Sequence, residues 1–176
     1  MRLFISINFD ARTKQKIIAV QNRLEQCVSG KFVHPDNIHL TLAFLGEVSP
    51  SRTQAVKQAM NQTHSSKLQL TFDHTGCFNR NGDGVWWLGI KHEETLIKLQ
   101  KTLTCALIVS GFSLDPRPFK PHITLARRVK PHDKIMKDNL LPAPFFAHAD
   151  TISLMHSHRI DGRLTYTEIY KTTLQK

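Results

Sequence analysis

The sequence predicts an α+β fold built as two similar lobes that share one cleft. Stretches with the two-residue period of strands alternate along the chain with stretches that have the 3.6-residue period of helices. A His-Leu-Thr-Leu strand at residues 39–42 is matched by a His-Ile-Thr-Leu strand at residues 122–125. At 176 residues the chain can form one compact domain or two small lobes packed together, and each lobe would give one motif strand to the cleft.

The first half of the chain is expected to hold a strand, a helix, the first motif strand, a second helix and a hairpin. These elements are predicted over residues 3–9, 11–27, 39–45, 50–64, and 68–78 with 85–91. Asp10 is the N-cap of the first helix and Gly30 its expected end, while Gly46 is expected to break the motif strand. Residues 79–84, rich in Asn and Gly, are the predicted hairpin loop.

The second half is expected to hold a third helix, the second motif strand and two further strands. They are predicted over residues 93–110, 122–126, 145–155 and 165–173. Gly111 ends the helix, and a basic polar loop follows Arg128. Three prolines within residues 115–121 fix φ and restrict their neighbours, so the approach to His122 is stiff. Residues 156–162 are expected to connect the last two strands.

The charge balance favours a polyanionic partner. Twenty-four Lys and Arg residues stand against fourteen Asp and Glu, which gives a net charge of +10. Because no basic amphipathic helix dominates the sequence, nucleic acid is a better candidate than a membrane surface. The alternative is that the basic excess only keeps the protein soluble.

Cysteine usage and the start of the chain favour the cytoplasm. Three cysteines that lie far apart, at 27, 77 and 105, indicate neither a disulfide framework nor a zinc cluster. The first predicted strand begins directly after Met1-Arg2 and is too short for the core of a signal peptide. No apolar stretch approaches the roughly 20 residues of a membrane span. We therefore expect a cytoplasmic protein with reduced thiols and no membrane partner.

The two His-x-Thr strands carry the candidate functional residues. Alternate side chains of a strand share a face, so His39 lies beside Thr41, and His122 lies beside Thr124. If the two strands are neighbours, two imidazoles and two hydroxyls meet in one small polar site. Such a site can give and take protons near neutral pH and donate hydrogen bonds to the non-bridging oxygens of a phosphodiester.

The motif by itself leaves an alternative open. Ten histidines and fifteen threonines in a chain of this length predict roughly one His-x-Thr triplet by chance. Requiring an apolar residue after both the His and the Thr lowers the expectation to roughly 0.14, against two matches found. Both stretches could still be ordinary strands that present His and Thr to solvent.

Longer segments around the motifs extend the pattern. The chain resembles the 2H phosphoesterase superfamily, and in particular the bacterial RNA 2',3'-cyclic phosphodiesterases, also called 2'-5' RNA ligases. The matching segments are RLFI at 2–5, NIHLTLAFLGEV at 37–48, FKPHITLAR at 119–127, Ser157, and residues 162–166. The resemblance implies a bilobal fold of two pseudo-symmetric lobes, with mainly antiparallel sheets forming a central cleft and helices on the outside. It also implies that residues 1–176 form a single bilobal catalytic domain.

The resemblance implies metal-free hydrolysis of RNA or nucleoside 2',3'-cyclic phosphates to 2'-phosphomonoesters. His39 and His122 are the expected catalytic residues, with His39 as proton donor and His122 as acceptor. Thr41 and Thr124 are expected to bind the non-bridging oxygens. No metal and no cofactor are expected, and the expected form is a monomer. A reversible 2'-5' RNA ligase and a non-catalytic module that binds RNA ends are the alternatives.

Three further residues are candidate substrate contacts. Arg127 would clamp the phosphate, but strict alternation points it away from Thr124, so a twist or bulge must bring it round. A solvated basic edge is its alternative. Phe44 and Phe119 are candidates to stack on a base, with core packing as the alternative. His156 and His158 could form a two-ligand metal pair, but no carboxylate or Cys cluster accompanies them.

Overall fold

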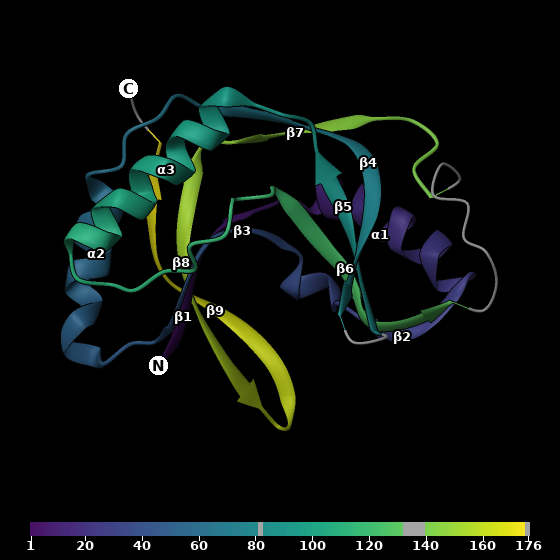
Figure 1. The fold of residues 1–176 in the computed structure, drawn as a ribbon, viewed down its shortest axis with the longest axis horizontal. Helices are drawn as coiled ribbons and strands as arrows, with labels where there is room; N and C mark the ends of the chain where they lie inside the picture. Colours follow the sequence, from purple (N-terminus) through teal and green to yellow (C-terminus); the bar gives the residue numbers. More distant parts are fainter. Residues whose placement is uncertain (81–82, 132–139, 175–176) are drawn as a thin grey trace.

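Two antiparallel sheets, each holding one of the His-x-Thr strands, form the frame of the molecule (Figure 1). This computed structural model describes residues 1–80, 83–131 and 140–174. The first sheet has the strand order β3-β1-β8-β9, and the second has the order β2-β6-β5-β4-β7. The first-sheet strands, in that order, are His39–Glu47, Arg2–Asn8, Thr151–Ile160 and Arg163–Thr173. Those of the second sheet are Val28–Phe32, His122–Pro131, Asp83–Ile90, Leu68–Arg80 and Phe145–Ala149.

Among the described residues, three helices cover these sheets from outside, as expected for the α+β fold (Figure 1). They are α1 (Ala11–Glu25), α2 (Thr53–Asn61) and α3 (Glu94–Val109), and two short 3-10 turns are η1 (Pro35–Asn37) and η2 (Pro50–Arg52). Helices α2 and α3 pack together on the first sheet, where they contact β9 and β3 respectively, while α1 contacts β2 of the second sheet. None of the helices in the described part of the chain has the length and apolar character that crossing a membrane requires.

The lobes are interwoven rather than consecutive halves of the chain. Strands β2, β4 and β5 of the first half complete the second sheet around β6. Strands β8 and β9 of the second half complete the first sheet beside β1. Strand β6 is therefore paired on both sides with strands from the first half, whereas β3 pairs with β1, which in turn pairs with β8 of the second half.

The predicted N-cap of the first helix agrees with the structure, whereas the predicted start of the second helix does not. The Asp10 carboxylate accepts a hydrogen bond from the Thr13 amide at 2.7 Å and so caps α1. The Glu93 side chain caps α3 through the amides of Thr95 and Leu96. The predicted second helix is divided, because its first three residues form η2 and α2 begins only at Thr53.

The end of α1 differs from the prediction. The helix ends at Glu25, and Gly30 lies inside β2, a strand that lacks apolar alternation and was not predicted. A Cβ atom at Gly30 would stand 3.0 Å from Val129 Cγ2 and 3.2 Å from the Arg127 carbonyl oxygen. Glycine at this position serves the close approach of β2 to β6 rather than the end of a helix. Gly46 likewise lies within β3, with a φ of +69°, and does not end the strand.

The last two strands are longer than predicted. Residues 156–162 were expected to be a connection, yet β8 runs to Ile160 and β9 begins at Arg163. A two-residue turn joins them, and both Asp161 (φ 48°) and Gly162 (φ 77°) have the positive φ that such tight hairpin turns require. Because this segment is mostly polar, it lacks the alternation of apolar and polar residues that predicts a strand. The predicted basic loop after Arg128 is shortened because β6 continues to Pro131, and residues 132–139, like 81–82 of the other loop, lie outside the described residues.

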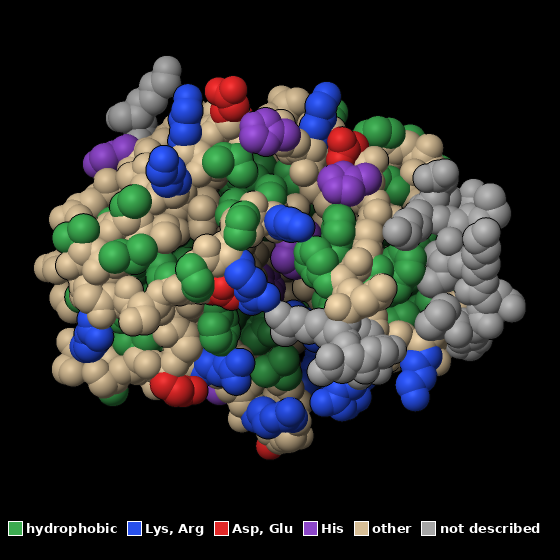
Figure 2. Space-filling view, in the orientation of Figure 1, with side chains coloured by type: hydrophobic (Ala, Val, Ile, Leu, Met, Phe, Trp, Pro, Cys, Tyr) green, Lys and Arg blue, Asp and Glu red, His purple; other side chains and the backbone are tan. Residues whose placement is uncertain are grey.

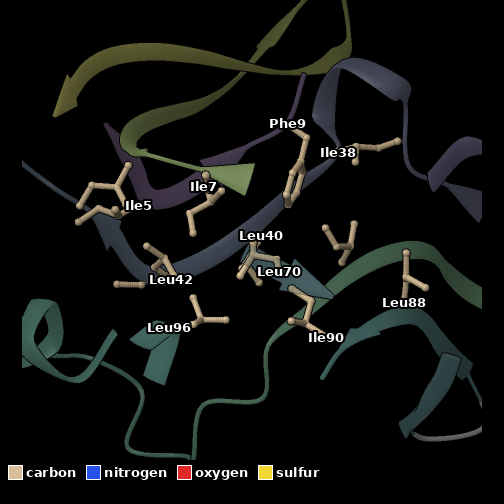
Figure 3. Packing of buried hydrophobic residues seen from close by; sticks show 14 of the residues in the cluster. Ile5, Ile7, Phe9, Ile38, Leu40, Leu42, Leu70, Leu88, Ile90 and Leu96 are labelled. Atoms are coloured by element: carbon tan, nitrogen blue, oxygen red, sulfur yellow. The ribbon is translucent and has the colours of Figure 1, made fainter. Parts of the chain in front are cut away.

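Apolar residues of both sheets pack into one continuous core (Figure 3). Leu40 and Leu42 of β3 point into it, where they meet Leu70 of β4 and Leu96 of α3. Each of these four side chains is at most 3% exposed. Because Leu40 and Leu42 face the core, strand alternation turns His39 and Thr41 to the opposite face of the sheet.

Candidate active site

Each motif strand carries a bulge directly after its threonine. In the pairing of β1 with β3, Ser6 lies opposite Thr41 but Ile5 lies opposite Ala43, which leaves Leu42 as the extra residue. The bulge interrupts alternation, so Leu42 and Ala43 are both buried. Phe44 consequently returns to the face that carries Thr41, where it is 46% exposed.

The same irregularity recurs in β6. Trp87 lies opposite Thr124 and Trp86 lies opposite Ala126, so Leu125 is the extra residue. Leu125 and Ala126 are both fully buried, and Arg127, which is exposed, returns to the Thr124 face. The bulge that the position of Arg127 required is thus present in the strand. Phe44 and Arg127 occupy equivalent positions in the two motifs.

His39 is held by its own strand and the turn before it. Its Nδ1–H donates to the Asn37 carbonyl oxygen at 2.7 Å, and the Thr41 hydroxyl lies 2.9 Å from Nε2. A carbonyl can only accept, so in the neutral ring Nε2 is the unprotonated nitrogen and the Thr41 hydroxyl donates to it. The pKa of His39 is lowered to about 4, mainly by burial and also by the charges of Arg127, Lys14 and His122, while the hydrogen bond to the Asn37 carbonyl acts in the opposite direction.

His122 is held in an equivalent way. Its Nδ1–H donates to the carbonyl oxygen of Lys120, again two residues earlier, at 2.6 Å. The stiff proline-rich segment before β6 positions that carbonyl. Burial is the main cause that lowers the pKa of His122, and the Arg127 charge adds to it. Both imidazoles therefore present Nε2 as the nitrogen available for proton transfer.

The two motifs meet across a cleft. Strands β3 and β6 are in contact, and the charge of His122 is close enough to act on His39. The charge of Arg127 lowers the pKa of both histidines. Figure 2 shows a hollow near the centre of the viewed face, with a histidine in its wall and Lys or Arg side chains around it. This arrangement would attract and hold a small anion between two proton carriers.

Aromatic rings flank each histidine. The rings of Phe4 and Tyr166 lie 4.8 and 5.3 Å from that of His39, between ring centroids. The rings of Phe78 and Trp87 lie 5.2 and 6.1 Å from that of His122. These rings desolvate the imidazoles, which explains the direction of both pKa shifts.

Tyr166, Phe4 and Asn37 were assigned no role from the sequence. Tyr166 lies on β9 and His39 on β3, the two edges of a four-stranded sheet, so the sheet must curl to bring their rings together. Burial raises the pKa of Tyr166, while the nearby charges of Arg127 and Arg2 lower it. The signal in the sequence was that all three fall within the segments that carry the family resemblance, at 2–5, 37–48 and 162–166.

The two phenylalanine candidates differ in their surroundings. Phe44 is exposed, and the guanidinium carbon of Arg2 lies 5.1 Å from its ring centroid. Phe119 is half-buried and packs against the core. The position of Phe44 suits a contact with substrate, whereas that of Phe119 agrees with the core-packing alternative.

His156 and His158 lie outside this cluster. Their rings are stacked, with centroids 4.5 Å apart and planes at 6°. The Thr167 hydroxyl lies 2.8 Å from His158 Nε2. Within residues 1–80, 83–131 and 140–174, no group of three or more His, Cys, Asp or Glu side chains is arranged to hold a metal ion.

Comparison with known families supports the interpretation of the motifs. A family model described as LigT like Phosphoesterase matches residues 7–87 and, a second time, residues 88–166. The first match contains His39 and the second contains His122. Each half of the sequence therefore carries one copy of the family pattern.

Individual relatives extend over most of the chain. A protein of Escherichia coli (strain K12) named RNA 2',3'-cyclic phosphodiesterase is 34% identical over 98% of this chain and 96% of its own length. One of Archaeoglobus fulgidus with the same name is 30% identical over 72% of each chain. Among solved structures, E. coli LigT in apo form superposes with a TM-score of 0.84 at 31% identity, covering 99% of this chain and 98% of LigT. A LigT structure complexed with 3'-AMP also gives 0.84.

Proposed function

The chain belongs to the LigT-like phosphoesterases, and from that premise we propose that it hydrolyses the 2',3'-cyclic phosphate at the end of an RNA or on a nucleotide. The product would be a 2'-phosphomonoester with a free 3'-hydroxyl. One observation carries the proposal: His39 and His122 each bind a backbone carbonyl through Nδ1, which leaves two Nε2 atoms for proton transfer. The names of the relatives indicate the substrate class.

Two proton transfers would accompany one displacement at phosphorus. Nε2 of His122 takes a proton from the attacking water as the new bond between oxygen and phosphorus forms. The bond from phosphorus to the ribose 3' oxygen breaks, and Nε2 of His39 gives that oxygen a proton. Each histidine then returns to its starting state by proton exchange with solvent. Neither transfer requires a metal ion or a cofactor.

Binding of the anionic substrate would favour the protonated form of His39, which the free protein does not hold at pH 7. With a pKa of about 4, His39 is neutral at pH 7 and has no proton to donate from Nε2. A phosphate between the two rings would offset the Arg127 charge and raise the pKa of both histidines. His39 would therefore acquire its proton as the substrate binds, so that binding prepares the acid.

The remaining candidates would hold the substrate. The hydroxyls of Thr41 and Thr124 would donate to the non-bridging oxygens, where charge increases in the transition state. The Arg127 guanidinium would pair with the same oxygens. Phe44 would stack on the base, a contact that tolerates any sequence. The exposure of Phe44 supports its role, and the two matching bulges, which turn Phe44 and Arg127 to the faces that carry the threonines, support both.

The proposal extends to the state of the protein. We expect residues 1–176 to act as a single bilobal catalytic domain, because one core joins the two sheets. We also expect a monomer in the cytoplasm.

Incubation with a nucleoside 2',3'-cyclic phosphate tests the function. Phosphorus NMR distinguishes the cyclic diester from the 2' and 3' monoesters, so it reports both turnover and the bond that breaks. We expect the 2' monoester alone. Binding of the cyclic nucleotide without turnover would support the non-catalytic alternative, and formation of the 3' monoester would reverse the assignment of the leaving oxygen.

A further inference from the structure

One face of the β8–β9 hairpin continues outward from His39. Ser157 pairs with Tyr166, and Arg159 pairs with Leu164, one step closer to the turn. Paired residues and their second neighbours share a face, so these four side chains lie on one side of the hairpin. Because Tyr166 contacts His39, that side is the one that faces the candidate active site. In Figure 1 the hairpin extends beyond the neighbouring strands.

The outer part of this face is accessible and of mixed character. Leu164 is 42% exposed, and Arg159 is exposed. Nη1 of Arg159 donates to the Gly162 carbonyl oxygen at 2.5 Å, which keeps the guanidinium at the tip of the hairpin. An exposed apolar side chain beside a guanidinium offers contacts for a ribose or base and for a phosphate.

The hairpin is fixed relative to His39. The side-chain amide of Asn37 donates to the Leu164 carbonyl oxygen at 2.9 Å, while the Asn37 backbone carbonyl holds the His39 ring. Arg163 adds an ion pair with Asp36 at 3.6 Å and a contact with His34, both in or next to η1. A surface tied to the site in this way can bind a ligand in a constant position relative to the reacting phosphate.

We propose that this face, formed by Ser157, Arg159, Leu164 and Tyr166, binds the nucleotides that precede the terminal cyclic phosphate of an RNA. The inference rests on the proposed function and narrows its substrate class from any cyclic nucleotide to the end of a chain. A net charge of +10 favours a polyanion, and grooves that bind single strands combine cationic groups with apolar or aromatic contacts. The first contact after the reacting nucleotide would be with Tyr166 and Ser157, and the next with Arg159 and Leu164.

The test compares two substrates that end in the same nucleoside: a nucleoside 2',3'-cyclic phosphate, and a four-nucleotide RNA with that cyclic phosphate at its 3' end. For the wild-type protein we expect a higher kcat/KM with the RNA. Arg159→Glu lowers kcat/KM about tenfold or more for the RNA and leaves the nucleotide value unchanged. Arg159→Lys keeps most of the preference, because Lys retains the charge.

Lys101→Glu is the matched control. Lys101 is exposed on α3, and its substitution changes the net charge by the same amount as Arg159→Glu. We expect Lys101→Glu to leave kcat/KM unchanged for both substrates at physiological salt. In the wild type, the plot of log kcat/KM against log salt should be steeper for the RNA, by about 0.7 per phosphate contact.

Three results would overturn the inference. Equal kcat/KM for both substrates would show that the preceding nucleotides are not bound. A similar loss of kcat/KM for the RNA in Arg159→Glu and Lys101→Glu would show that the loss comes from the change in net charge and not from this face. A loss for both substrates in Arg159→Glu would mean that the hairpin acts on His39 rather than on the RNA. If the wild type turns over neither substrate, the proposed function itself fails, and that outcome is separate from these three.

Discussion

The backbone carbonyl of Asn37 accepts a hydrogen bond from Nδ1 of His39 at 2.7 Å, and this one contact determines which nitrogen of the ring can do chemistry. Lys120 serves His122 in the same way. An amide side chain in place of the imidazole could still form the carbonyl hydrogen bond, but it could not carry a proton near neutral pH.

His39→Asn and His122→Asn are therefore expected to remain folded and to lose turnover. Each proton transfer contributes about 10²- to 10⁴-fold, so we expect a loss of at least about 100-fold in kcat for each variant. Initial rates with a nucleoside 2',3'-cyclic phosphate measure the effect, and circular dichroism measures folding. A folded variant with kcat within tenfold of wild type would contradict the two-histidine mechanism.

Folding stability should decrease at acidic pH because of His39. Its pKa is about 4 in the folded protein against 6.5 for the model group, so between these values only the unfolded chain binds the proton. The contribution is complete above pH 6.5 and is lost as pH falls towards 4, at about 1.4 kcal/mol per pH unit. From pH 6.5 to pH 5 the loss is about 2 kcal/mol.

Urea unfolding at pH 6.5 and 5 measures this loss. His39→Gln removes the titrating group and should reduce the difference between the two pH values. His148→Gln, at an exposed site on β7, is the matched control and should leave the difference unchanged. Equal pH dependence in the wild type and in His39→Gln would show that His39 is not held neutral by the fold.

Removal of the Arg127 charge should raise the pKa of both motif histidines. The guanidinium lowers both values, although burial is the larger cause for each. In Arg127→Gln, imidazole titrations followed by NMR should move upward for His39 and His122 together. Arg128→Gln is the control, because Arg128 is the adjacent exposed arginine and takes no part in either shift. A shift for only one histidine would place Arg127 beside that ring alone.

Chelation should leave the reaction unchanged. Both proton transfers and the contacts with the phosphate are assigned to side chains, so treatment with EDTA followed by gel filtration is expected to preserve kcat. Elemental analysis of the treated protein confirms that metal has been removed. Loss of activity that a divalent cation restores would require a metal in the mechanism.

The sequence by itself determined the local features. Alternation within residues 39–45 and 122–126 shows that Leu40 and Ile123 face the core and that the histidines do not, because a strand turns successive side chains to opposite faces. Asp10 predicted the start of α1, because its carboxylate can accept a hydrogen bond from a backbone amide of the first turn that has no partner within the helix. The two His-x-Thr strands indicated phosphoester chemistry, because residues two apart on a strand share a face and each strand therefore presents an imidazole beside a hydroxyl.

Only the tertiary structure decided what surrounds those residues. The bulges at Leu42 and Leu125 exist only in the pairing with β1 and β5, and they determine where Phe44 and Arg127 lie. Tyr166 reaches His39 only because the first sheet curls, and strand pairing over more than a hundred residues leaves no periodic signal in the chain. Local periodicity reports which face of an element is apolar, whereas register and curvature depend on partners that are distant in sequence.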